Sequence, residues 1–331
     1  MQAHESWDGT MKTMVGRAPR ALPLAAAAMI VAMLAGCGGS ASPSPVPPSA
    51  APPATVAPSA TPNPTPEPTP TAPAGSLDLI LATTTSTQDS GLLDVLVPAF
   101  EKASGYTVKT VAVGSGAALK LGEEGNADVL LVHSPAAEKA FMDAGHGVDR
   151  QLVMHNTFLI VGPAADPAGI AGMTSPTEAF KKIAAAKATF VSRGDGSGTE
   201  AKELGFWKAV GITPAAPWYI QSGQGMAATL QIASEKAAYT LTDIATWAAT
   251  RSQLALGDLV HGDPSLLNIY HVIGVNPASW PKVNAAGATA FAAYLLSAEG
   301  QALIGSFGVD TYGMQLFVPD AGKSESDLTA P

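Results

Sequence analysis

Cysteine and the common catalytic motifs are scarce in this chain. Its 331 residues contain a single cysteine, Cys37, which excludes a disulfide framework and a zinc site built from several thiolates. No Gly-x-Ser-x-Gly elbow, no phosphate-binding P-loop with its lysine and no His-Glu-x-x-His motif occurs. The sequence therefore matches none of these familiar enzyme classes. We expect a protein without enzymatic activity, without a cofactor and without a resident metal ion.

The chain also has few positively charged residues. The chain has 18 Lys and Arg against 27 Asp and Glu, which leaves a formal net charge of −9. An acidic protein is a poor partner for nucleic acid or for an anionic membrane surface, so we expect no nucleic-acid partner. This balance does not exclude a buried anion site, because local dipoles and single cations decide the potential there.

The N-terminal region has the pattern of a secretory signal. Three basic residues between 12 and 20 precede an apolar run at 21–35, which is too short for a comfortable membrane span. The run ends in Leu-Ala-Gly-Cys at Cys37, which closely resembles the lipid-attachment signal of bacterial lipoproteins. This resemblance implies a signal peptide at 1–37 and lipidation of Cys37. The mature protein would then be extracytoplasmic and anchored to the cell membrane, in a periplasm or on the outer face of the cytoplasmic membrane.

A proline-rich segment follows the signal. Residues 41–75 contain 13 of the 27 prolines and a single charged residue, Glu67. Such a composition cannot bury a core and favours extended, partly polyproline II structure. At about 3.1 Å per residue it would span roughly 110 Å when stretched. We therefore predict that residues 38–76 form a disordered tether between the lipid anchor and a folded part.

The remainder alternates between strand-like and helix-like apolar runs. Strands are expected at 77–81, 107–113, 128–132, 153–161, 188–191 and 268–275. Helices are expected at 92–103, 117–122, 136–144, 175–186, 200–210, 225–234, 242–249, 285–296 and 299–307. This alternation predicts an α/β fold with mixed or parallel sheets and flanking helices. We expect two lobes joined by two crossing strands, with 77–154 plus 276–331 in lobe 1 and 155–275 in lobe 2.

Three turns rich in glycine and hydroxyl groups stand where a strand meets a helix. They are Ala82–Thr87, Val113–Gly116 and Ser192–Thr199. The free N–H groups of a helix start attract negative charge, and Arg193 adds a permanent cation with a fork of donors. In α/β sheets the carboxyl ends of strands are the usual ligand site. The three turns therefore predict one shared cage for an oxyanion.

The region from Leu79 to Phe317 resembles the solute-binding proteins of bacterial ABC importers, which are two-lobed periplasmic binding proteins. The tungstate-binding family gives the best match. The resemblance is carried by Ala82–Leu92, Ala127–His133, Ser192–Thr199, Trp218-Tyr219, Gly223–Met226 and Ala238–Leu241. It implies a monomer that captures tungstate or molybdate between its lobes and delivers it to a membrane permease with its ATPase. It places the ligand contacts on Thr84, Thr85, Ser86, Ser115, Arg193, Ser197, Gly198 and Thr199, with tungsten present only as the bound oxyanion.

The choice of anion rests partly on hydrogen-bond chemistry. Tungstate and molybdate are fully deprotonated near neutral pH, so their cage needs donors alone, whereas phosphate keeps a proton and its binders resemble one another in supplying a carboxylate acceptor. That acceptor would lie near His133 or Ser134, where this chain has no acid. Asp195 is interpreted as the group that orients Arg193. The preference for tungstate over molybdate rests on the resemblance alone.

Two positions depart from the family pattern, which usually has Asp where this chain has Ser134 and His where it has Glu200. We expect Glu200 to face solvent. The motif Arg-x-Asp-x-Ser-Gly-Thr is shared with phosphate-binding proteins, so a phosphate or molybdate binder of the same fold remains an alternative. A lipid-anchored anion sensor would share all these features.

Two further features of the sequence bear on other functions, a dinucleotide-like motif and the histidines. Gly223–Ala228 fits Gly-x-Gly-x-x-Ala with Asp243 downstream, as in dinucleotide-binding folds, but 218–222 makes a poor buried strand. The scattered histidines favour surface or core positions over a metal site. They are His133, His146, His155, His261 and His271.

Overall fold

The computed structural model describes residues 76–329. The expected signal peptide, Cys37 and all but the last residue of the expected tether lie outside this range. Within it, no helix combines the length and apolar character that a membrane crossing requires.

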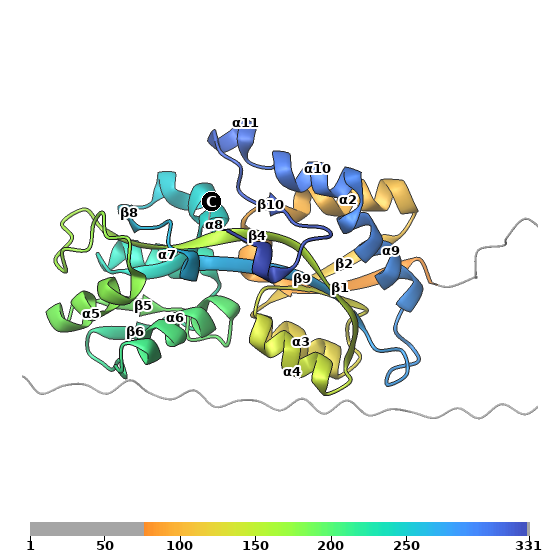
Figure 1. Cartoon of the computed structure of the whole chain (residues 1–331), viewed down its shortest axis with the longest axis horizontal. Coiled ribbons are helices and arrows are strands. Elements are labelled where there is room, and N and C mark those ends of the chain that lie inside the picture. Colours follow the sequence, from red (N-terminus) through yellow and green to blue (C-terminus); the bar gives the residue numbers. More distant parts are fainter. Residues whose placement is uncertain (1–75, 330–331) are drawn as a thin grey trace, which may run out of the picture. The chain divides into compact units, whose positions relative to one another are not determined.

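The first part of the described chain is a parallel α/β unit. Strand β1 (Asp78–Thr84) pairs in parallel with β2 (Thr107–Val113) and with β3 (Val129–Val132), as the alternation of strands and helices predicts. Figure 1 shows this unit in orange and yellow, with helices packed on both sides of the strands. Its elements are β1 (Asp78–Thr84), α1 (Thr85–Asp89), α2 (Leu93–Ser104), β2 (Thr107–Val113), α3 (Ser115–Glu123), β3 (Val129–Val132) and α4 (Pro135–Asp143).

Two long strands connect this unit to the next. Strand β4 (Gly147–Pro163) pairs antiparallel with β9 (Leu267–Val275), and β9 pairs with β3. Beyond Thr157 the partner of β4 changes, because Phe158–Val161 pairs with β7 (Thr240–Asp243). Both strands run between the two groups of helices in Figure 1. The expected crossing strands are therefore present, and β4 begins six residues earlier than predicted.

The second unit contains shorter strands. Strand β5 (Phe190–Ser192) pairs in parallel with β6 (Tyr219–Gln221), and β8 (Leu256–Val260) adds to β4. The sequence pattern missed β7 and β8, and it rated 218–222 a poor strand although three of its residues form β6. Partial burial against β5 makes up for the weak apolar pattern there. The helices are α5 (Pro176–Ala186), α6 (Gly198–Ala209), α7 (Met226–Glu235) and α8 (Ile244–Thr250).

The C-terminal segment returns to the first unit. It contains α9 (Ala285–Leu296), α10 (Ala298–Ser306), α11 (Val309–Tyr312) and β10 (Val318–Pro319), which pairs with β4. A buried hydrogen bond of 2.6 Å between His155 Nδ1 and an Asp320 carboxylate oxygen fixes it to β4. The two histidines on these crossing strands, His155 and His271, both pair with carboxylates, which agrees with core roles.

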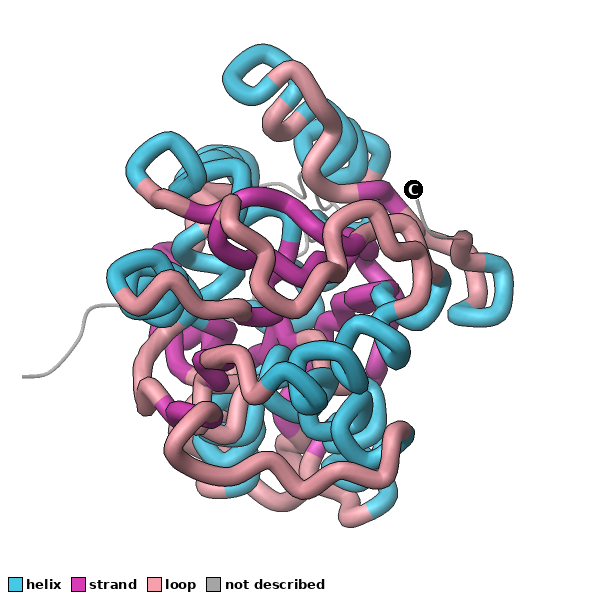
Figure 2. Tube along the Cα trace, turned by 90° about the vertical axis from the view of Figure 1, so that its left-hand side faces the viewer, coloured by secondary structure: helices cyan, strands magenta, loops and turns pink. Residues whose placement is uncertain are grey.

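Two large apolar clusters hold these units together. One contains Leu81, Leu131, Phe100 and Phe291, and the other contains Phe180, Phe190, Trp207 and Tyr239. Figure 2 shows the strands in the interior with helices and loops around them. We call the part built on β1–β3 and α9 the first lobe, and the part built on β5–β7 and α6 the second lobe. The exact boundaries between the lobes stay a prediction.

Candidate functional site

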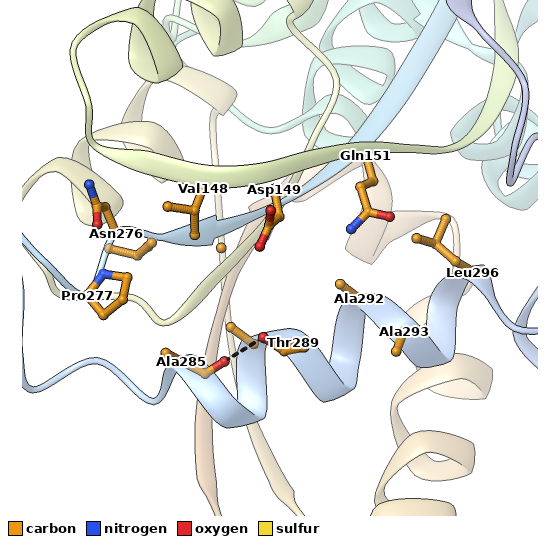
Figure 3. A pocket seen from close by; sticks show the side chains of 13 residues that line it. Val148, Asp149, Gln151, Asn276, Pro277, Ala285, Thr289, Ala292, Ala293 and Leu296 are labelled. Carbon is orange, nitrogen blue, oxygen red and sulfur yellow. Dashed lines mark hydrogen bonds between the residues drawn. The ribbon is translucent and has the colours of Figure 1, made fainter.

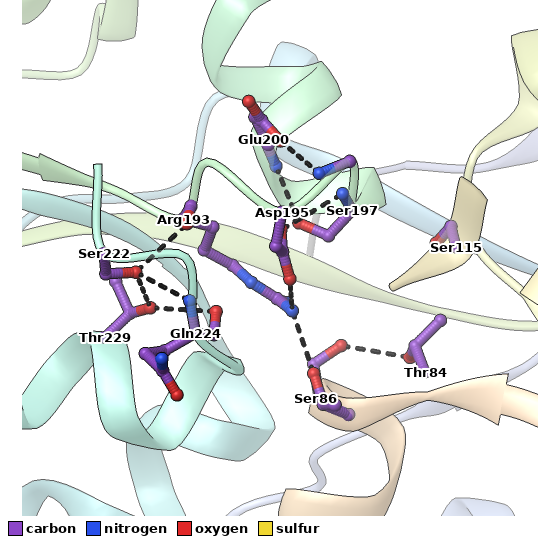
Figure 4. Close-up of polar contacts among 12 residues, drawn as sticks. Thr84, Ser86, Ser115, Arg193, Asp195, Ser197, Glu200, Ser222, Gln224 and Thr229 are labelled. Atoms are coloured by element: carbon purple, nitrogen blue, oxygen red, sulfur yellow. Dashed lines mark hydrogen bonds and ion pairs between the residues drawn. The ribbon is translucent and has the colours of Figure 1, made fainter. Parts of the chain in front are cut away.

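The three predicted turns meet where the lobes touch. Thr84 ends β1 and caps α1, Gly114 precedes α3, and Ser197 caps α6 by accepting from Glu200 N at 3.2 Å. Hydrogen bonds cross between the lobes here: Arg193 Nη2 donates to Thr85 Oγ1 at 2.9 Å, and Gly198 N donates to Ser115 Oγ at 3.2 Å. Figure 4 shows Arg193 reaching towards the start of α1. The sequence-predicted contact residues therefore lie in one place.

Arg193 is the dominant feature of this junction. Its side chain is only 1% exposed, and Nη2 forms an ion pair with Asp195 Oδ2. Asp195 Oδ1 accepts from Ser197 N at 3.1 Å, so both carboxylate oxygens are engaged within the loop. The interpretation of Asp195 as the group that orients Arg193 is confirmed. Nε and Nη1 of the guanidinium, in contrast, have no partner among the described residues. Buried, unpaired N–H groups on a cation are costly to leave unsatisfied, and they suit an anion.

Three further hydroxyl groups of the predicted site can act as donors. Thr199 Oγ1 is buried and has no partner among residues 76–329. Ser197 Oγ and Ser115 Oγ each accept a backbone N–H, from Glu200 and Gly198 respectively. A hydroxyl that accepts in this way still has its own proton to donate. Gly198, one of the expected site residues, donates its amide N–H to Ser115 Oγ in this structure.

The first lobe contributes a compact hydroxyl cluster. Thr84 Oγ1 lies 2.6 Å from Thr87 Oγ1 and 3.2 Å from Ser86 Oγ. Both Thr84 and Ser86 contact His133 Nε2, at 3.0 and 3.1 Å. All four side chains are buried. The hydroxyls here bond mainly to one another and to the imidazole.

His133 supports this cluster as a neutral acceptor. Burial, followed by repulsion from Arg193, lowers the pKa of His133 to about 4. Its Nδ1 lies 2.8 Å from Asn268 Oδ1, and the amide of Asn268 is oriented because its Nδ2 donates to Asn156 and Tyr270. We therefore assign the ring proton to Nδ1, which leaves Nε2 free to accept from a hydroxyl.

The sequence pattern indicated a surface or core position for His133, close to the expected position of a phosphate acceptor, and the contacts of His133 with Thr84 and Ser86 were missed. The available signal was its position directly after the buried strand β3, at the sheet edge where the other turns lie. Asn268, on β9, gave no signal because it is distant in sequence and unremarkable in its local pattern.

The carboxylates around the junction already serve as acceptors. Burial raises the pKa values of Asp89 and Asp243, and the charge of Arg193 opposes this rise in both. Asp89 Oδ2 accepts from Ala227 N at 3.2 Å, while Asp243 caps α8 through Ala245 N and Thr246 N. Glu200 does not simply face solvent as expected. It is half-buried, and its Oε2 accepts from Gly196 N at 2.5 Å.

The glycine turn that mimics a dinucleotide motif packs on the first lobe. Gly225 precedes α7, and a Cβ added there would lie 3.2 Å from Thr85 Cβ. Ala227 N is engaged by Asp89. Figure 4 shows Ser222 and Gln224 beside the Arg193 loop, where Ser222 Oγ donates to the Arg193 carbonyl at 3.1 Å. The turn therefore supports the anion site. Within residues 76–329, no group of three or more metal-ligating side chains occurs.

A separate cavity of about 500 Å³ lies between α9 and the paired strands β4 and β9 (Figure 3). None of its lining residues is basic, and Asp149 places a carboxylate at its wall. The hydroxyl of Thr289 is engaged with the Ala285 carbonyl at 3.0 Å. This cavity lacks the convergent donors of the lobe junction and does not suit an anion.

Comparison with known proteins agrees with this geometry. A model described as a PBP superfamily domain matches residues 55–299. The tungstate-binding protein TupA of Peptoclostridium acidaminophilum is 49% identical over 248 residues, which cover 74% of this chain and 86% of that protein.

Two solved structures show the same relationship. A structure described as the tungstate ABC transporter from Geobacter sulfurreducens is 46% identical, with a TM-score of 0.65 over 70% of this chain and 98% of that one. The tungstate-binding protein TupA from Desulfovibrio alaskensis G20 is 48% identical, with a TM-score of 0.60 over 74% and 99%. The expected periplasmic-binding-protein fold is confirmed. The chain belongs to the PBP superfamily and, within it, to the TupA family of tungstate-binding proteins.

Proposed function

We propose that this protein captures tungstate between its two lobes and delivers it to the membrane permease of an ABC importer. The observation that carries the proposal is the buried guanidinium of Arg193 at the junction of the lobes, whose Nε and Nη1 have no hydrogen-bond partner among residues 76–329. Membership of a family of binding proteins, rather than enzymes, supports the same conclusion. Thr199, Ser197 and Ser115 supply further donors around that charge.

A donor-only cage favours a fully deprotonated dianion. Both oxygens of Asp195 and of Asp243 accept hydrogen bonds within the protein, and Asp89 Oδ2 accepts from Ala227 N. Among the described residues, the buried side-chain atoms left without a partner at Arg193 and Thr199 are donors. Near Ser134 the closest acid is Glu138, whose Oε1 accepts from Ser134 N at 2.6 Å. Its other oxygen pairs with Arg150 and His271. Hydrogen-bond chemistry thus favours tungstate or molybdate over phosphate, and the family favours tungstate.

The test is a calorimetric titration of the purified protein with tungstate, molybdate, sulfate and phosphate. We expect 1:1 binding of tungstate and molybdate, with little heat from the other two. At a thousandfold excess over the dissociation constant, the bound anion should stabilise the folded state by about 4 kcal/mol, visible as a rise in melting temperature. Binding of phosphate alone would contradict the donor-only argument and favour a phosphate carrier.

We also propose that Cys37, outside the described residues, carries a lipid that anchors the protein to the cell membrane. The support is the Leu-Ala-Gly-Cys sequence after a short apolar run. Changing Cys37→Ser should move the protein from the membrane fraction to the soluble fraction, with unchanged tungstate affinity. Retention of the variant in the membrane fraction would place the anchor elsewhere.

A further inference from the structure

The backbones of the two lobes touch on either side of Ser115. A Cβ added to Gly114 would lie 3.0 Å from the carbonyl oxygen of Asp195. A Cβ added to Gly116 would lie 3.0 Å from the carbonyl oxygen of Gly196, which also accepts a 3.2 Å hydrogen bond from Gly116 N. The nearest non-local atoms to both glycines belong to the second lobe. No side chain separates the lobes at these points.

A glycine of the second lobe lies equally close to atoms of the first lobe. Gly198 begins α6, and a Cβ there would lie 2.8 Å from the carbonyl oxygen of His133 and 3.0 Å from Ser115 Oγ. Both atoms belong to the first lobe. A contact of 2.8 Å with a backbone oxygen is too short for a real Cβ, so any side chain at this position would push the lobes apart.

None of these three glycines is required by its own backbone conformation. Gly114 has φ −69° and ψ 154°, which any residue adopts, while Gly116 and Gly198 lie in the first turns of α3 and α6. Glycine is a weaker helix former than alanine, so each lobe alone would tolerate or prefer alanine at the helical positions. Only the approach of the other lobe requires the missing Cβ.

We infer that Gly114, Gly116 and Gly198 form a glycine seam, a backbone-to-backbone stop that sets how closely the lobes approach around the bound anion. The inference rests on the proposed function. Backbone atoms already in contact cannot be compressed, and no flexible side chain between them can adjust. The seam thus sets the width of the closed cage and allows Arg193 in one lobe and Ser115 in the other to contact one ligand.

The first test compares Gly116→Ala with Gly205→Ala. Gly205 lies in α6, and an added Cβ there meets no atom within 4 Å, so it is a matched control. Gly116→Ala should weaken tungstate binding at least tenfold in calorimetry, while the control keeps the wild-type affinity. Neither variant should lower the melting temperature of the unliganded protein. Wild-type affinity in Gly116→Ala would overturn the seam.

A second measurement reads lobe spacing without relying on the ligand. Spin labels can be attached to cysteines introduced by Lys120→Cys in α3 and Lys208→Cys in α6, in a Cys37→Ser background. Both positions are exposed, and double electron–electron resonance between the two labels measures the distance between the lobes. The shortest populated distance should be longer in Gly116→Ala than in the otherwise identical protein with Gly116, with or without tungstate. Identical distance distributions would overturn the seam. Failure of the protein with Gly116 to bind tungstate would instead overturn the proposed function.

Discussion

The two lobes prepare their halves of the anion site in different ways. In the first lobe, the hydroxyls of Thr84 and Ser86 bond to each other and to neutral His133. In the second lobe, Arg193 and Thr199 have buried donor atoms with no partner among the described residues. The hydroxyls of the first lobe are largely paired with one another and with His133, whereas the second lobe carries a permanent charge of which Nε and Nη1 have no partner among the described residues.

This difference has a chemical basis. A hydroxyl rotates and can exchange one acceptor for another, so mutual bonding within the first lobe is compatible with later binding of an anion. A guanidinium is a rigid fork that cannot donate all its N–H groups to one small partner. Asp195 orients that fork without saturating it. We therefore expect the second lobe to contribute most of the binding energy and the first lobe to complete the cage.

The largest expected effect is at Arg193. Changing Arg193→Ala should weaken tungstate binding by about 3–5 kcal/mol, because charge-assisted bonds are lost from a desolvated site. Arg193→Lys should lose less, since the charge remains while the fork is lost. Calorimetric titration measures both variants. Nearly unchanged affinity in Arg193→Ala would refute the expectation that the second lobe contributes most of the binding energy.

The contribution of His133, in the first lobe, to the free energy of unfolding is expected to change with pH by about 3 kcal/mol. His133 has a pKa of about 4 in the folded protein against about 6.5 when unfolded, so the unfolded chain binds the extra proton between these values. The stability that depends on neutral His133 is complete above pH 6.5 and is lost as the pH falls to 4. The stability difference between wild type and His133→Gln, from denaturant unfolding, should shrink by about 3 kcal/mol over that window.

The comparison with a variant is necessary because Glu203 titrates in the opposite sense. Burial raises the pKa of Glu203 to about 7, so its contribution to stability falls as the pH rises from 4.5 to 7. The two effects oppose each other in the wild type. A stability difference independent of pH would show that His133 titrates normally.

The smallest effects separate the two kinds of hydroxyl. Thr199→Val should weaken tungstate binding by about 1–3 kcal/mol without lowering stability, because it removes a buried hydroxyl that has no partner within the described part of the chain. Thr84→Val should weaken binding by a similar amount and also lower stability by about 1 kcal/mol, because Thr84 caps α1. Calorimetry and thermal unfolding measure the two quantities. Equal losses of stability in Thr199→Val and Thr84→Val would contradict the distinction between an unpaired hydroxyl in the second lobe and a paired one in the first.

Much of the architecture follows from local pattern. The strands β2 and β9 and the helix α9 lie within one residue of their predicted bounds, because apolar periodicity there is strong. Strand β1 ends three residues later than predicted, since the polar residues Thr83 and Thr84 extend it beyond the apolar run. The short strands β7 and β8 were missed because their pairing with β4 is decided by distant residues. The same holds for β6, which forms only because β5 lies beside it.

The sequence by itself determined which chemical groups could hold an anion. Three turns at strand ends, one arginine and a set of hydroxyls are local features, and their position at helix starts follows from residue type and periodicity. Tertiary structure alone decided how these groups are used. The proton on His133 depends on Asn268, which is 135 residues away, and the glycine seam depends on contact between two lobes. Such relationships arise from the packing of distant segments, which residue patterns along the chain do not record.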